Sequence, residues 1–441
     1  MKHPTTAIVV PVAMGLALCG SAFGNTPETS TETLRAEIAA LRAEVAKLSA
    51  DDNWLTEQRS EEIRGLVQDV LADADTRASL LQGGMTAGYD DGFVLGSTDG
   101  NFSLKMNGQL QSRFVFNNQD ESVGGDSTRW GFENTRTKLW FSGNVVNPDW
   151  TYFIEGNFGR DGGSFVLEDA YISYAYGTGW TATIGQFKAP FLREELVHSM
   201  YQQAVERSLI NEWFTAGRTQ GVMMDYFGEQ FHFAGAFLQD GANTANTAWS
   251  TYDTEWASGL RVEALLSGNW DQFQDFASWP DEEMGFMIGG AFHYQLQEYG
   301  TVTPNELEIY RFTVDASVEF GNANVFAAVI YATAENDATG AAAVDLEQMA
   351  FLIQGGYFLN ADWELFGRWE WADPDMTGVD DVNIFTAGVT RYWAGHGLKW
   401  TSDIGYGIDG VPVSADIAGW RQDGLGQDGQ IVFRTQMQLA F

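Results

Sequence analysis

Apolar and polar residues alternate along the last twelve residues of the chain, from Gln430 to Phe441. One face carries Ile431, Phe433, Thr435, Met437, Leu439 and Phe441, and the other carries Val432, Arg434, Gln436 and Gln438. A period of two residues is typical of a β-strand with one apolar and one wet face, and about ten such residues match a tilted crossing of an outer membrane. The pattern therefore predicts a membrane-spanning strand that closes on a C-terminal Phe.

The same alternation recurs back to Phe102 and predicts sixteen strands. They cover residues 102–116, 132–146, 150–159, 166–176, 180–188, 220–228, 231–239, 254–267, 285–297, 306–320, 324–334, 347–359, 363–372, 382–393, 398–409 and 430–441. Short turns and longer polar loops alternate between them, as they do in outer-membrane barrels. The expected fold class is all-β, a closed antiparallel transmembrane β-barrel of about 16 strands over residues 102–441.

Closure of the sheet follows from the needs of the backbone. Backbone groups that face lipid have no water to bond, so a sheet can cross a membrane only without free edges. A ring of sixteen to eighteen strands encloses an aqueous lumen. A soluble β-sandwich is the alternative explanation of the alternation, but it does not account for the terminal Phe and the aromatic-tipped strands.

The two-residue period also predicts which side chains face the lumen. The inward positions are Lys105, Asn107, Gln109, Gln111 and Arg113 on the first strand, Asn134, Arg136, Lys138 and Asn144 on the second, and Glu155 and Asn157 on the third. Leu110, Thr135 and Thr137 are among the residues expected to face lipid. These assignments require an unbroken period, because a bulge reverses the faces beyond it.

Three segments precede the barrel. Residues 1–24 hold Lys2, an apolar run and small residues before Gly24, which is the pattern of a signal peptide. Residues 25–81 carry Leu34, Ile38, Leu41, Val45 and Leu48 at heptad spacing, which predicts a short α-helical coiled coil as a periplasmic stalk. A lone amphipathic helix on another surface is the alternative. Residues 82–101 are glycine-rich and are expected to form a flexible joint.

Charge and motifs exclude several classes of function. The formal net charge is −36, and residues 221–441 hold 7 basic against 32 acidic groups, so a nucleic-acid partner is not expected. The five histidines lack metal-ligand spacing, and no GxSxG, HExxH or Walker pattern is present. The sequence therefore predicts no enzyme, no metal and no cofactor.

Two connections are unusual. The longest, residues 189–219, holds apolar residues that require burial, and in a barrel the available place is the lumen. Its charged residues Arg193, Glu194, Glu195, Glu206, Arg207, Glu212 and Arg218 would then surround a constriction. Residues 268–284 should form a short periplasmic turn, yet the segment is long and holds Trp270, Phe273, Phe276 and Trp279.

The chain resembles the phosphate-selective porin family of porins O and P. The resemblance rests on LEDAYISYAYGTGWTATIGQFKAPFLREELVHSMYQQAVERSL from Leu167 and on ENTRTKLWFSGNVVNPDWTYFIEGNFG from Glu133. It implies a homotrimeric sixteen-stranded porin in lipid of the cell outer membrane, with its third external loop (189–219) folded inward. In that family inward-facing arginines guide phosphate through a basic eyelet, which here implies Arg136, Lys138, Lys188, Arg193, Arg207 and Arg218.

Two departures from the family pattern stand out. Phe153 occupies a position on the third strand where the family tends to place an arginine, and residues 189–219 hold three arginines against four glutamates. The sequence therefore predicts no continuous row of arginines along the pore. For Glu194, Glu195, Glu206 and Arg207, salt bridges that brace the loop are a stronger expectation than contact with solute.

The residues expected to line the pore and set its selectivity can now be named. They are Lys105, Arg113, Arg136, Lys138, Glu155, Lys188, Arg193, Glu194, Glu195, Glu206, Arg207 and Arg218. The predicted function is passive diffusion of small hydrophilic solutes, including phosphate or other anions. The alternative keeps the barrel but makes it a structural protein that tethers the outer membrane to the cell wall through residues 28–80.

The predicted stalk can be tested by placing charges in its heptad seam. Changing Ile38→Asp and Val45→Asp together buries unpaired carboxylates, at a cost on the order of several kcal/mol. We expect the helical circular-dichroism signal to melt at a lower temperature while the β signal persists. Glu37→Asp and Glu44→Asp, at flanking positions, are the matched control. An unchanged helical melt in the first variant would contradict the heptad assignment.

Overall fold

The computed structural model of the 441-residue chain describes residues 39–40, 42–43, 85–120, 127–239, 245–251, 253–299, 305–338, 343–376, 379–424 and 427–441. The chain divides into two compact units, Met1–Gly83 and Gly84–Phe441. In the first unit the four described residues are helical. The predicted signal peptide and the heptad positions of the stalk lie outside the described residues. Within the described part, no helix has the length and apolarity needed to cross a membrane.

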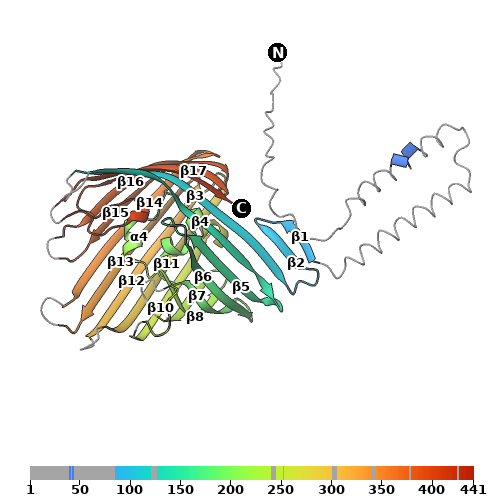
Figure 1. Ribbon diagram of the computed structural model, residues 1–441, viewed down its shortest axis with the longest axis horizontal. Helices are drawn as coiled ribbons and strands as arrows, with labels where there is room; N and C mark the ends of the chain where they lie inside the picture. The colour runs from blue at the N-terminus through green and yellow to red at the C-terminus, as the bar shows by residue number, and fades with distance from the viewer. Residues whose placement is uncertain are drawn as a thin grey trace, which may run out of the picture. The chain divides into compact units, whose positions relative to one another are not determined.

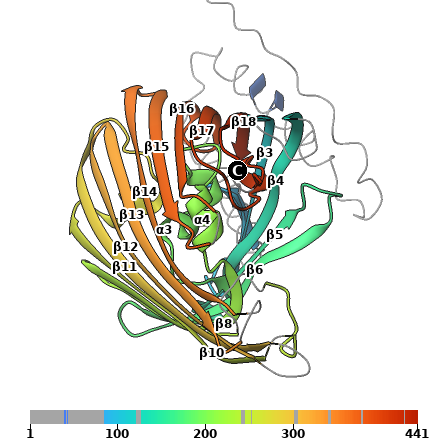
Figure 2. The same ribbon diagram turned by 90° about the vertical axis from the view of Figure 1, so that its left-hand side faces the viewer.

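Sixteen strands, β3 to β18, form a closed barrel in the described part of the second unit. Each strand pairs antiparallel with the next (Figure 1), and β18 pairs with β3 to close the ring (Figure 2). Their bounds are β3 Ser103–Gln119, β4 Thr128–Val145, β5 Asn147–Phe158, β6 Phe165–Tyr176, β7 Trp180–Lys188, β8 Arg218–Phe227, β9 Phe231–Leu238, β10 Asp253–Ser267, β11 Glu282–Tyr299, β12 Asn305–Gly321, β13 Ala323–Asn336, β14 Asp345–Asn360, β15 Trp363–Asp373, β16 Val382–Ala394, β17 Leu398–Gly407 and β18 Gln430–Ala440. The predicted sixteen-stranded antiparallel barrel is confirmed.

The barrel has two distinct ends. The first strand begins and the last strand finishes at the same end, which we call the terminal end, and the opposite end is the loop end. The outward face is apolar over much of its area, and Leu110, Ile184 and Val314 are 40%, 61% and 67% exposed. Because every strand of the ring has a hydrogen-bonded neighbour on both sides, the backbone N–H and C=O groups of the strands find partners within the sheet, as a sheet in lipid requires.

Residues 82–101, predicted as a flexible joint, instead contain a β-hairpin. Strands β1 (Met85–Tyr89) and β2 (Phe93–Ser97) pair with each other, and β2 also pairs with the start of β3. The turn uses Asp91 and Gly92 with φ of 48° and 146°, values that glycine and aspartate tolerate better than most residues. Of the glycines in this segment, Gly88 therefore lies in a short edge strand and Gly92 in a tight turn.

A β-bulge in β4 changes the predicted faces of two residues. Gln111 pairs with Arg136 and Ser112 pairs with Asn134, so Thr135 is the extra residue. Thr135 is buried, whereas the Asn134 side chain bonds the Ser112 hydroxyl on the exposed face. The prediction that Asn134 faces the lumen and Thr135 faces lipid is therefore wrong. Beyond the bulge, Glu133 takes the lumen side.

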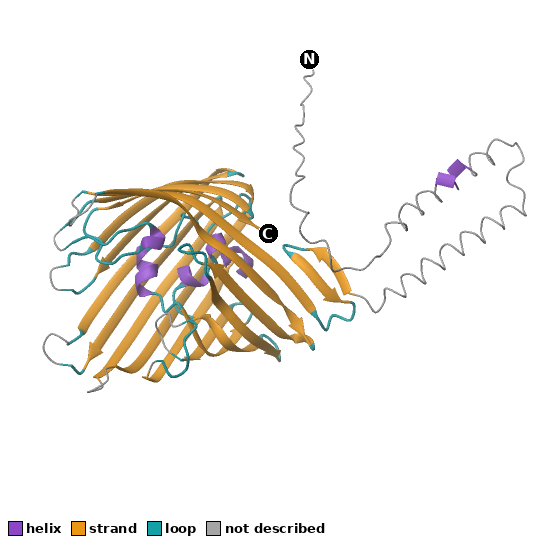
Figure 3. Ribbon diagram, viewed as in Figure 1, coloured by secondary structure: helices purple, strands orange, loops and turns teal. Residues whose placement is uncertain are grey.

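The connection between β7 and β8 lies inside the barrel. This loop-end segment (189–217) contains α3 (Arg193–Leu196), the short 3-10 helix η1 (Ser199–Tyr201) and α4 (Leu209–Phe214). Figures 2 and 3 show these helices within the ring of strands. The segment bonds wall residues on several sides, including Arg261 of β10, Lys399 of β17 and Gln438 of β18.

A second segment enters from the terminal end. This terminal-end segment (268–281) joins β10 to β11 and contains η2 (Trp270–Gln274). Phe276 packs on Val197 and Phe326, so the aromatic residues that are unusual for a turn contribute to the packing of the lumen. The backbone carbonyl of Phe276 accepts a hydrogen bond from Nε2 of Gln203 at 3.3 Å. The two inward segments therefore touch each other inside the barrel.

Close approach between the wall and the loop-end segment depends on Gly356 in β14. Nε2 of Gln203 donates to Oε1 of Glu364 at 2.6 Å directly over this glycine, and Glu364 is fully buried. A Cβ atom at position 356 would overlap both side-chain ends. The missing side chain is thus what lets Gln203 reach the wall.

We therefore expect Gly356→Ala to destabilise the barrel. The added methyl group must push Gln203 and Glu364 apart, and overpacking of this kind costs about 1–3 kcal/mol. Thermal unfolding in detergent, followed by circular dichroism, measures the effect. Gly367→Ala on the neighbouring strand β15 is the matched control, because the closest heavy atom to its methyl group is Thr386 O at 3.9 Å. Equal unfolding temperatures would disprove the role of Gly356.

Candidate functional site

Glu206 joins the loop-end segment to β3 and β4. Its Oε1 accepts from Nη1 of Arg113 at 2.8 Å, and its Oε2 accepts from Nη2 of Arg136 at 2.8 Å. All three side chains are buried. Burial alone would raise the pKa of Glu206, but Arg136 and Arg113 hold it below its usual value. Arg113 and Arg136, the two wall arginines that the sequence predicted to line the pore, thus both pair with the carboxylate of Glu206.

Glu195 and Glu194 make contacts both within the loop-end segment and with the barrel wall. Glu195 pairs with Lys188 and with Arg207 at 3.4 Å each, and although burial opposes ionisation, these cations hold its pKa well below the usual range. Glu194 accepts from the backbone N–H of Ser208 at 2.7 Å, and burial raises its pKa. Glu194 also pairs with Arg368 of β15 at 3.6 Å, and the bracing role of these residues stays a prediction.

A second ionic cluster lies on the wall formed by β4 to β8. Nζ of Lys138 donates to Glu155 at 2.9 Å and also to Glu168. Arg218 pairs with Asp169 at 2.8 Å, with Glu168 at 3.1 Å and with Glu155 at 3.4 Å. This cluster therefore contains three carboxylates and two cations, a local excess of negative charge.

The remaining predicted site residues lie apart from these clusters. Arg193 pairs with Glu263 at 3.6 Å and donates to the backbone carbonyl of Phe273, so it joins the two inward segments. Lys105 is half-buried and lines a separate cavity of about 720 Å³ near the terminal end, together with Trp140 and Tyr201. The structure thus distributes the predicted residues over several places in the lumen.

Sequence reasoning missed a large part of this network. The missed residues include Glu133, Glu168, Asp169, Arg261, Glu263, Asp315, Arg368, Glu370 and Asp403, all of which form ion pairs with lumen residues. Most lie at alternate positions of strands beyond the third, where extending the two-residue period would have found them. Glu168 and Glu133 could not be found in this way, because each lies at or beyond a bulge.

Seven of the eight predicted bases of the pore, all except Lys105, are therefore paired with carboxylates. Ion pairs are made by Arg113, Arg136, Lys138, Lys188, Arg193, Arg207 and Arg218. A cation that is already neutralised holds a permeating anion less strongly than an unpaired one. Among the described residues, this pattern differs from a basic eyelet.

Glu212 on α4 is the fourth glutamate of the loop-end segment, after Glu194, Glu195 and Glu206. It is half-buried, and burial raises its pKa to about 7, with Arg207 opposing this shift and Glu195 and Glu206 adding to it. Its charge therefore changes near neutral pH, inside the segment that narrows the lumen.

A cavity lies between the wall and part of the loop-end segment. This cavity of about 390 Å³ is lined by residues of β5, β6, β7 and β8 together with Leu196 and His198. It adjoins the ionic cluster of Glu155, Asp169 and Arg218, which contribute to its lining. A solute that moves along this wall therefore meets the paired charges directly.

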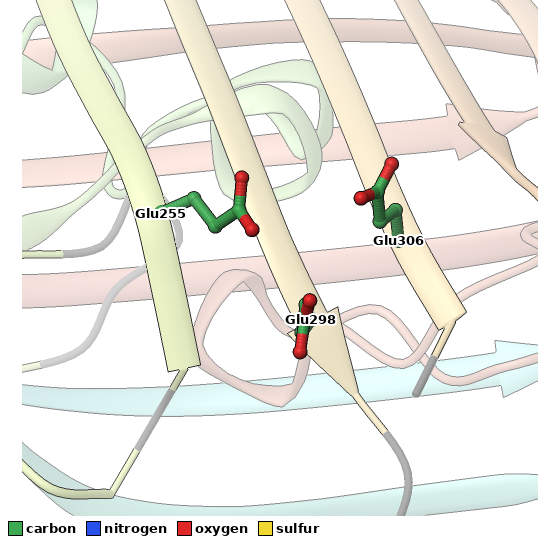
Figure 4. A group of neighbouring side chains, drawn as sticks. All are labelled: Glu255, Glu298 and Glu306. Atoms are coloured by element: carbon green, nitrogen blue, oxygen red, sulfur yellow. The ribbon is translucent and has the colours of Figure 1, made fainter. Parts of the chain in front are cut away.

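Three glutamates gather at the loop end of neighbouring strands. Oxygen atoms of Glu255, Glu298 and Glu306 lie within 4.8 Å of one another, and Figure 4 shows them on β10, β11 and β12. Glu255 and Glu306 are exposed to solvent. Carboxylate groups in this arrangement add negative charge to the rim of the barrel and attract cations weakly.

Comparisons with known proteins agree with this architecture. The model of the family "Phosphate-selective porin O and P" matches residues 104–376. An uncharacterized protein of Aquifex aeolicus is 23% identical over 260 residues, which cover 54% of this chain and 63% of that protein. The chain therefore spans less than two thirds of that relative.

Solved structures share the fold at low sequence identity. An anion-selective porin from Comamonas acidovorans has a TM-score of 0.55 at 15% identity, with 77% of this chain and all of that chain covered. The outer-membrane channel DcaP of Acinetobacter baumannii has a TM-score of 0.53 at 12% identity, with 80% and 100% covered. The family match spans more than half of the chain, and on that ground the protein belongs to the phosphate-selective porin O and P family.

Proposed function

We propose that the protein is a homotrimeric channel of the outer membrane through which small hydrophilic solutes diffuse passively. The observation that carries the proposal is the closed barrel whose lumen is narrowed by an ion-paired segment from the loop end. Family membership supports the outer-membrane location and the channel role. A helical stalk in the periplasm, formed by residues 25–81, is part of the proposal. The tethering alternative depends on residues 28–80 and gains no support from the relatives.

Because the charges of the lumen are mostly paired, they support only a weak preference of the channel for anions or for cations. At ~0.15 M salt, charges more than about 8 Å from a permeating ion are largely screened, so the acidic rim contributes little. The wall bases Arg113, Arg136, Lys138 and Lys188 then give a slight preference for anions, including phosphate. At low salt the longer screening length lets the acidic second half of the chain act, and the preference drifts toward cations.

The wall bases can be tested by changing Arg136→Gln and Lys138→Gln together. The change removes two positive charges and leaves Glu206, Glu155 and Glu168 with fewer partners. We expect the ratio of anion to cation permeability to fall about twofold or more, as for a charge effect of ~0.5 kcal/mol or more per ion. Reversal potentials of single channels in asymmetric salt measure this ratio.

Arg129→Gln is the matched control, because this arginine is exposed at the loop end of the same strand. It should leave the reversal potential unchanged. A wild-type channel that is strongly cation-selective at both high and low salt, or a double variant with an unaltered potential, would contradict the role of the wall bases. A purified barrel that conducts no ions would remove the channel proposal itself.

Glu212 predicts a pH dependence of selectivity. Its pKa lies near 7, so the side chain is neutral below that pH and negative above it. Raising the pH from 5.5 to 8.5 should therefore shift the reversal potential toward cations, since a negative charge appears in the narrow segment. The Glu212→Gln variant should lose most of this shift, whereas Glu229→Gln, at an exposed turn, should retain it. A shift of equal size in all three proteins would exclude Glu212 as its source.

A further inference from the structure

The cavity of about 390 Å³ along β5 to β8 contains an aromatic platform. Phe153 and Tyr171 stack with ring centroids 5.3 Å apart and an interplanar angle of 18°. Phe187, Leu196 and Met223 extend the apolar surface around this pair. Phe153 and Tyr171 are only half-buried, and both line the cavity. Exposed stacked rings on the wall of a water-filled lumen present a flat surface to passing solutes.

Hydrogen-bonding groups surround this platform. The hydroxyl groups of Ser173, Thr181 and Thr183 line the same cavity, and those of Ser173 and Thr183 lie 2.8 Å apart. Asp169 and Asp225 supply acceptors, and Lys188 and Arg218 supply donors. The volume falls within the range of small-molecule pockets, about 300–1,000 Å³, and an apolar wall with a few convergent polar groups is their usual composition.

The charges of the cavity disfavour an anion as its occupant. Arg218 is already shared among carboxylates, with Asp169 at 2.8 Å, and Lys188 is paired with Glu195 at 3.4 Å. Burial lowers the pKa of His198 to about 4, so this ring adds no positive charge at neutral pH. Glu155, Asp169 and Asp225 all line the cavity. A solute that both donates and accepts hydrogen bonds suits such paired charges better than a second anion does.

We propose that this cavity is a subsite for a neutral cyclic polyol, the chemistry of a sugar ring. The apolar C–H face of the ring lies against Phe153 and Tyr171, while its hydroxyl groups bond Asp169, Arg218 and the threonine hydroxyls. The inference rests on the proposed channel function and adds the class of solute. It also gives a role to Phe153, which stands where a phosphate channel would favour an arginine.

The test uses the full-length protein in planar bilayers with glucose, mannitol and inorganic phosphate as probes. Mannitol has as many carbons and more hydroxyl groups, but it has no ring. We expect glucose to reduce the single-channel current at lower concentrations than mannitol does. Tyr171→Leu removes half of the platform and should raise the half-blocking glucose concentration roughly 5- to 10-fold, the loss expected for one aromatic contact. Tyr174→Leu is the matched control, because this tyrosine is exposed on the outward face of the same strand.

The outcomes separate this inference from the channel proposal. Open-channel current without sugar reports folding of each variant, and Phe153→Leu offers a second test of the platform if Tyr171→Leu forms no channels. Equal block by glucose and mannitol, or block by phosphate at lower concentration than glucose, overturns the polyol subsite while the channel stands. An unchanged glucose block in both platform variants also overturns it. A wild-type protein that does not conduct overturns both proposals.

Discussion

Backbone hydrogen bonding in lipid is the constraint on which this structure depends. Because no water reaches the hydrocarbon, the sheet must close, which it does from β18 to β3. The pleat of each strand then points successive side chains alternately toward lipid and toward the lumen. The polar half of every strand is thus collected inside one ring. The loop-end and terminal-end segments fold into that ring, and they are held there by wall side chains that would otherwise need water or one another.

Charge pairing inside the ring then determines what the lumen can recognise. A charge moved out of water is stable only with a partner, and breaking such a pair by removing one member is strongly destabilising, by about 3–5 kcal/mol when both are buried. Glu206 between Arg113 and Arg136 satisfies this requirement within the protein. The same pairing that fixes the loop-end segment therefore weakens the attraction for a free anion, and solute contacts other than charge become important.

The sequence predicted the barrel well because period two is a long-range signal repeated in every strand. All sixteen strands were found, but Arg136, Lys138 and Glu155, which were predicted to line the pore and set its selectivity, lie buried in ion pairs. Asn134 and Thr135 were assigned to the wrong faces because a one-residue bulge leaves no mark in the alternation. The hairpin β1–β2 was missed because its strands have only five residues each, including one glycine, which is too short a stretch for the two-residue alternation to be recognised. Pairing partners such as Glu168 depend on register across strands, which a single sequence does not specify.

Contacts between the two inward segments help to position the narrow part of the lumen. Arg193 of the loop-end segment bonds the backbone of Phe273, and Gln203 bonds the backbone of Phe276, so both contacts use carbonyl groups of the terminal-end segment. Backbone acceptors hold their place regardless of side-chain rotamer, as long as η2 keeps its own fold. Asn269 and Gln272 stabilise that fold through a reciprocal capping box at its start. The width of the lumen at the loop-end segment is therefore set from both ends of the barrel, and the aromatic residues that seemed excessive for a turn are the packing that keeps its carbonyls in position.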